Sequence, residues 1–64
     1  MSEYIVLQYF QWGQLILEKG QHLLVERTSD DHSMVSIKHY PEKSQLVGTK
    51  SIETMIVLQK IKEY

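Results

Sequence analysis

The sequence predicts an α+β domain in which an N-terminal amphipathic helix packs on a small antiparallel sheet of three or four strands. Three observations predict this fold. Apolar and polar residues alternate over residues 22–28 and again over 34–40, which is the period-two pattern of half-buried strands. A loop rich in Ser and Asp, residues 29–33, separates these two segments. Residues 2–20 instead repeat at spacings of three and four, as a surface helix does.

The N-terminal segment is predicted to be helical because its polar and apolar residues fall on opposite faces. Ser2 can cap such a helix, and Gly20 can end it in a left-handed conformation. Gly13 argues against a helix, because it costs about 1 kcal/mol relative to Ala in a helix interior. The polar positions are Gln8, Gln11, Gln14 and Glu18, and the apolar positions are Ile5, Tyr9, Trp12 and Ile16.

The same segment also fits two strands, and this interpretation stays open. Residues Tyr4–Phe10 and Leu15–Glu18 would pair around a turn at Gln11–Gln14, and their aromatic and β-branched residues favour strands. The alternative fold is then an all-β, SH3-like small barrel. A likeness of that kind concerns the fold alone and implies no function.

The clearest element is the hairpin made by the two alternating segments. Leu23 and Val25 point to one face of its first strand, and Val35 and Ile37 to one face of its second strand. Ser and Asp side chains in the loop can hydrogen-bond the local backbone and stabilise the turn. Pro41 is expected to end the second strand, because proline has no backbone N–H to donate.

The C-terminal third is predicted to add strands to this hairpin. A short strand at Gln45–Thr49 follows a polar turn, and Gly48 suggests a bulge or an early end. Met55–Ile61 is rich in β-branched residues and is interpreted as a strand. A helix there would carry apolar side chains on every side. Residues Lys62–Tyr64 are expected to fray.

Length and composition predict one small cytoplasmic domain, residues 1–64. A chain of 64 residues buries only about 60% of its unfolded surface, and without cysteine it has no disulfide or thiolate zinc site to compensate. We therefore expect a homo-oligomer, most simply a dimer. The sequence shows no signal-peptide pattern and no membrane span. Because it begins at a methionine and shows no second domain, we expect a complete small gene product.

Motifs for catalysis or metal binding are lacking. His22 and His39 would lie near each other at the ends of the hairpin, but no third or fourth metal ligand is spaced with them. No Gly-rich phosphate loop is present, and no nucleophile motif surrounds the serines. We therefore predict no metal, no cofactor and no enzymatic activity.

Aromatic residues near the N-terminus are the better candidates for function. Large rings fill cores, and they are also enriched at the energetic centres of protein interfaces. On the predicted helix, Tyr4, Leu7 and Leu15 would form an exposed apolar patch, and such patches usually bind something. The predicted function is a non-enzymatic protein-binding module that inhibits or adapts another protein, the kind of small regulator that phages and other mobile elements encode. Its predicted docking residues are Tyr4, Leu7, Tyr9, Trp12 and Leu15.

The alternative is a small nucleic-acid-binding protein that uses a lysine-bearing face of the sheet. The formal net charge of -1 gives no overall attraction to phosphate, but residues 34–64 carry five lysines against three acidic residues. A lysine beside an aromatic ring can contact the backbone while the ring stacks on a base. The predicted contacts of this alternative are Lys38, Tyr40, Lys60 and Lys62.

Overall fold

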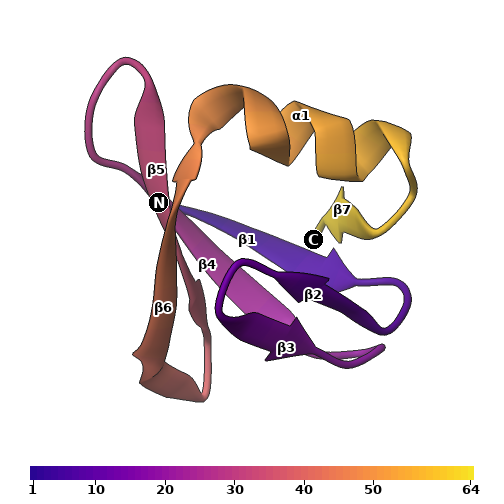
Figure 1. Ribbon diagram of the computed structural model, residues 1–64. Helices are drawn as coiled ribbons and strands as arrows, with labels where there is room; N and C mark the ends of the chain where they lie inside the picture. Colours follow the sequence, from indigo (N-terminus) through magenta and orange to yellow (C-terminus); the bar gives the residue numbers. More distant parts are fainter.

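The computed structural model describes residues 1–64 and consists mostly of β-strands, with one short helix near the C-terminus (Figure 1). Five strands form an antiparallel sheet in the order β6-β5-β4-β1-β7, and β2 and β3 form a separate two-stranded hairpin. The elements are β1 (Ser2–Val6), β2 (Phe10–Trp12), β3 (Leu15–Leu17), β4 (His22–Arg27), β5 (His32–Ile37), β6 (Tyr40–Gly48), α1 (Thr49–Val57) and β7 (Ile61–Glu63).

The predicted N-terminal helix is wrong, and the sheet has five strands where three or four were predicted. Gly13 decides the local structure, because its φ of +62° lies in the left-handed region that a helix interior excludes. It begins the two-residue turn that joins Trp12 to Leu15, and a positive φ at the first turn position is typical of a type II′ hairpin. The strand interpretation of this segment is closer, although α1 means that the chain is not all-β.

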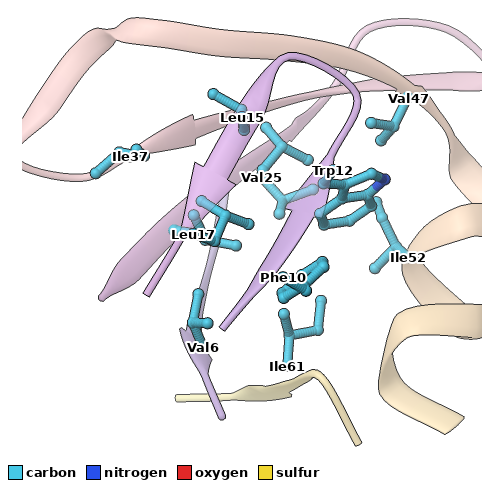
Figure 2. Close-up of a cluster of buried hydrophobic side chains, with 12 residues drawn as sticks. Val6, Phe10, Trp12, Leu15, Leu17, Val25, Ile37, Val47, Ile52 and Ile61 are labelled. Atoms are coloured by element: carbon cyan, nitrogen blue, oxygen red, sulfur yellow. The ribbon is translucent and has the colours of Figure 1, made fainter. Parts of the chain in front are cut away.

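The β2–β3 hairpin covers one face of the five-stranded sheet, and the core lies between them (Figure 2). Side chains alternate along both hairpin strands, so Gln11 and Ile16 face solvent while their neighbours point inward. No fully buried side chain lies on the opposite face of the sheet, which is open to solvent. The core consists of Val6, Phe10, Trp12, Leu15, Leu17, Leu23, Val25, Val35, Ile37, Val47, Ile52 and Ile61.

Gln45 attaches the tip of the β2–β3 hairpin to the strand β6 at the sheet edge. Its Oε1 atom accepts a hydrogen bond from the Gln14 backbone N–H at 3.0 Å. A Cβ atom on Gly13 would lie 2.6 Å from Gln45 Cδ. A side chain at this turn position would therefore displace the Gln45 amide that holds the hairpin tip.

Gly13→Ala is expected to lower the free energy of unfolding by about 1–3 kcal/mol, because the new methyl group is strained at positive φ and displaces the Gln45 amide. Gly20→Ala is the matched control, since Gly20 also has a positive φ of +92° but nothing lies within 4 Å of its Cβ position. Urea unfolding of both variants measures the difference. Equal losses would show that the contact with Gln45 adds nothing to stability.

The predicted central hairpin is confirmed as β4 and β5, although β5 begins and ends earlier than the predicted strand. Leu23 pairs with Ile37 and Val25 with Val35, and all four point into the core as predicted. Period two was therefore sufficient to identify both strands and their buried faces.

The prediction that the second strand of the hairpin ends at Pro41 is wrong. The chain turns after Ile37, and Pro41 lies within β6, which also contains most of the short strand predicted at Gln45–Thr49. β6 is an edge strand, and its register shifts next to the pair Ser36–Ser44. A missing N–H is tolerated at an edge or a bulge, because no neighbouring strand needs it.

The strand predicted at Met55–Ile61 is also wrong, because α1 occupies its first half. Ile52 is buried on the core side of α1, and Met55 packs against the core. The helix has only nine residues, and no helix of the structure is long and apolar enough to cross a membrane. The tail that was predicted to fray forms β7, which pairs with β1.

A candidate protein-docking surface at the end of the helix

The most exposed apolar run of the molecule lies at the C-terminal end of α1. Ile56 is 40% exposed, Val57 79% and Leu58 53%. Tyr9, in the connection between β1 and β2, is 66% exposed. We call these four residues the helix-end patch. Three consecutive exposed apolar residues are unusual unless they bind something.

A hydrogen-bonded cap at the C-terminus of α1 fixes the position of Ile56, Val57 and Leu58. The Gln59 N–H donates to the Ile56 carbonyl at 3.0 Å and the Lys60 N–H donates to the Met55 carbonyl at 2.9 Å, which is the hydrogen-bond pattern of a Schellman motif. Gln59 takes the left-handed position with a φ of +58°. The chain therefore reverses directly after Leu58 and leaves the end of the helix uncovered.

The β1–β2 connection lies beside the C-terminal cap of α1 and places Tyr9 near it. The Leu7 N–H donates to the Lys60 carbonyl at 2.8 Å, and Gln8 Nε2 donates to the Gln59 carbonyl at 3.4 Å. On the other side of Tyr9, the Phe10 ring lies 5.1 Å from Lys60 Nζ. Residues on both sides of Tyr9 thus touch the segment that follows α1.

The five predicted docking residues do not form one surface. Trp12 is 6% exposed and Leu15 is 4% exposed, so both belong to the core. Tyr4 is half-buried against the core, and Leu7 is half-buried in the connection after β1. Of the predicted set, only Tyr9 presents most of its side chain to solvent. The predicted patch depended on a helix over residues 2–20, and that segment is three strands.

Ile56, Val57 and Leu58 were missed, although the sequence contained a signal for them. The apolar residues around α1 follow no single stripe, and this pattern predicts a strand. In the structure this pattern has a different cause: one side of the helix covers the core through Ile52, and the other side remains exposed. An apolar pattern that is too wide for one buried face is thus also the pattern of a helix with an exposed apolar side.

The four predicted nucleic-acid contacts are dispersed over different parts of the surface. Lys38 Nζ lies 3.1 Å from Glu3 Oε2 in an ion pair on the open face of the sheet. Lys62 follows buried Ile61, so it points to that same face. Lys60 lies over the Phe10 ring, and Tyr40 is exposed near the β5–β6 turn under Lys43. The four residues do not share one face.

The histidines are not gathered with other potential metal ligands into one group. His22 lies in β4 on the open face, whereas His39 is exposed in the turn before β6. No group of three or more His, Cys, Asp or Glu side chains is arranged to hold a metal ion. The chemistry available to His22 is instead an interaction with a neighbouring carboxylate.

Glu3, His22 and Lys38 form a charged cluster on the open face of the sheet. His22 Nδ1 donates to Glu3 Oε2 at 2.6 Å, since a carboxylate can only accept. Lys38 Nζ donates to both Glu3 oxygens, at 3.2 and 3.1 Å. The Tyr64 ring meets the His22 ring edge-on at 4.5 Å between centroids. The hydrogen bond from His22, followed by that from Lys38, lowers the pKa of the Glu3 carboxyl.

Acidification is expected to weaken the fold through Glu3. Because its pKa is lower in the folded protein, the unfolded state binds more protons in acid, and the free energy of unfolding rises with pH there. This contribution is complete above the ordinary pKa of 4.5 and is lost as the pH falls through the lowered pKa of the folded state. Urea midpoints of wild type and Glu3→Gln between about pH 6 and pH 3 test this, and the variant should change less. If the urea midpoints of wild type and Glu3→Gln change equally with pH, Glu3 is not the source of the acid sensitivity.

No protein-family model, curated protein or solved structure matches this chain significantly. Function must therefore be inferred from the surfaces described above. Among these surfaces, the helix-end patch combines the highest apolar exposure with a fixed backbone.

Proposed function

We propose that this chain is a non-enzymatic protein-binding module that docks through the helix-end patch and inhibits or adapts its partner. The supporting observation is the exposure of Ile56, Val57 and Leu58 in one run beside the Tyr9 connection. Transfer of these side chains from water into a protein interface is favourable, because apolar burial drives association. Tyrosine is also enriched at the energetic centres of interfaces.

The partner that suits this patch is a protein with an apolar hollow. Val57 and Leu58 project where the helix ends, and side chains on a helix commonly anchor it in an apolar groove. Gln8 and Gln59 border the patch and supply polar groups for a rim that excludes water. The proposal places both proteins in the cytoplasm, the compartment predicted from the sequence.

The nucleic-acid alternative has less support. Lys38 is paired with Glu3, and Lys60 lies over an aromatic ring, so two of its four predicted contacts already have partners within the chain. Phosphate binding requires several cations along one track. Ionic strength separates the alternatives, because phosphate binding weakens steeply with salt and an apolar interface does not.

Site-specific photo-crosslinking tests the proposal. A photoreactive amino acid at position 57 is expected to give an adduct with one discrete protein when a lysate of the cells that make this chain is irradiated, and high salt added before irradiation should not reduce its yield. The matched control is the same amino acid in place of Ile16, which is 57% exposed on the outer side of β3. Equal adducts from both positions, or adducts with nucleic acid alone, would contradict the proposal.

A further inference from the structure

β6 forms one edge of the five-stranded sheet, and no other strand lies beyond it (Figure 1). The Thr49 N–H, directly after β6, donates to the Asp31 carbonyl at 2.8 Å. Hydrogen bonding alternates along an antiparallel ladder, so the backbone groups of Val47 and Gln45 also face β5. The backbone groups of Leu46, between them, must face outward.

The pairing on the other side of β5 gives the same alternation. The Lys38 N–H donates to the His22 carbonyl at 2.9 Å, so even-numbered residues of β5 bond to β4 and odd-numbered residues bond to β6. In the β5–β6 register Met34 faces Leu46, and neither is turned toward the other for backbone bonding. The outward-facing groups of Ser44 and Leu46 have no neighbouring strand to bond to, whereas Gly48 is the N-cap of α1, so its carbonyl accepts the first helix hydrogen bond. The one partner of the outward-facing groups of Ser44 and Leu46 is Gln45 Nε2, which donates to the Leu46 carbonyl at 3.0 Å.

On the open face of the sheet, Leu46 ends an apolar row. It lies opposite Met34, and Leu24 on β4 is diagonal to Met34 because it pairs with Ser36. Met34 and Leu24 are half-buried by their neighbours, whereas Leu46 remains 48% exposed. The row is thus interrupted at the edge of β6, where a further strand would cover Leu46.

We propose that β6 pairs antiparallel with β6 of a second copy of this chain, about a two-fold axis at Leu46. The two copies of Leu46 then lie opposite each other and exchange two backbone hydrogen bonds. The carbonyl has a second lone pair, so it can accept this bond while it keeps the Gln45 amide. On the open face, the apolar row becomes continuous from Met34 and Leu46 to the partner's Leu46.

The sequence of β6 favours an axis at Leu46 over its neighbours. With this axis the ladder is Ser44–Gly48, and it ends before the bulge. An axis at Ser44 would set Leu46 against Glu42 of the partner subunit and leave the apolar row without a partner. An axis at Gln45 would set Val47 against the charged Lys43 of the partner subunit. Of these three axes, the axis at Leu46 is the one that sets apolar side chains against each other on the open face.

A second copy suits this edge because the pairing is self-complementary. Edge strands of monomeric proteins are usually protected by proline, charge or a bulge. In β6, Pro41, Lys43 and the bulge protect only the first half, and residues 44–48 carry no such feature. A chain of 64 residues without disulfides also gains stability from association. The inference goes beyond the proposed function, since the helix-end patch belongs to other elements.

Light scattering during size exclusion tests the pairing at protein concentrations up to about 1 mM, where micromolar contacts are saturated. The mass is expected to rise from 7.6 kDa toward twice that value. Leu46→Lys and Leu46→Glu are each expected to stay monomeric, because like charges would meet at the axis. An equimolar mixture of the two is expected to recover the dimer, because opposite charges then meet. Val57→Lys should dimerise like the wild type, which separates this test from the proposed function.

Each other outcome decides against the proposal, provided that circular dichroism shows the Leu46 variants to be folded. A wild-type chain that stays at 7.6 kDa at all concentrations overturns it. A dimer that survives Leu46→Lys overturns it too, because the contact then lies elsewhere. A mixture of Leu46→Lys and Leu46→Glu that remains monomeric overturns the axis at Leu46, since residue 46 would not face its own counterpart.

Discussion

Replacing Trp12 with alanine is expected to lower the free energy of unfolding by about 3–5 kcal/mol. Trp12 is 6% exposed and lies 6.1 Å from Phe10 between ring centroids. The short turn at Gly13 holds the hairpin tip to β6 through Gln45, so the backbone cannot collapse freely into the cavity. A protein of 64 residues is expected to have a total stability of about 3–10 kcal/mol. The substitution therefore removes much or all of it, which urea unfolding followed by circular dichroism will show.

Tyr9→Ala is the matched control for this loss. Tyr9 lies three positions before Trp12 and is 66% exposed, so its removal is expected to change stability by no more than about 0.5 kcal/mol. Wild-type stability of Trp12→Ala would contradict the placement of the indole in the core. The same comparison shows that a loss of binding in Trp12→Ala cannot identify a docking residue, because the substitution removes much or all of the stability of the fold.

Val57→Lys is expected to weaken partner binding by about 2–4 kcal/mol, or roughly 30- to 1000-fold. A lysine in the centre of the helix-end patch would bury an unpaired charge in the apolar interface. The fold is expected to tolerate the change, because Val57 is 79% exposed and lysine has a higher helix propensity than valine. The last turn of α1 also has no basic residue. A positive charge there interacts favourably with the helix dipole and stabilises the helix. Titration calorimetry with the partner that crosslinking identifies measures the loss of affinity.

Ile16→Lys makes the same chemical change on a different surface. Ile16 is 57% exposed on β3, so its replacement is expected to leave the affinity within about twofold of wild type. Equal losses in both variants would show that added charge, and not the position, is responsible. Tighter binding of Val57→Lys to a polyanion than to any protein would favour the nucleic-acid alternative.

The N-terminal helix was predicted because a tight hairpin can imitate helical spacing. The inward residues of β2 and β3 are Phe10, Trp12, Leu15 and Leu17, and the two-residue turn sets Trp12 and Leu15 three positions apart. The glutamines recur at similar spacings because they occupy a connection, an outward strand position and a turn. Gly13 argued against the helix, as did the strand propensity of the aromatic and β-branched residues, and the positive φ of Gly13 shows why a helix cannot form there.

The central hairpin could be predicted because each strand buries one face and exposes the other. β4 and β5 keep strict alternation at Leu23, Val25, Val35 and Ile37. α1 could not be predicted in this way, because Ile52 packs on the core while Val57 stays in solvent, so its apolar residues follow no single period. The docking surface was missed for the same reason, since it depends on which side of the helix the core covers. That information is tertiary, and no periodicity of the segment contains it.

Amide hydrogen exchange of the chain, with and without the partner that crosslinking identifies, tests the docking surface most directly. The proposed docking surface predicts slower exchange over residues 52–60 and 7–10, which form and flank the helix-end patch. It predicts no change over residues 22–37, where β4 and β5 form the centre of the sheet. Protection confined to residues 22–37, with residues 52–60 unchanged, would contradict docking through the helix-end patch and would place the partner on the open face of the sheet.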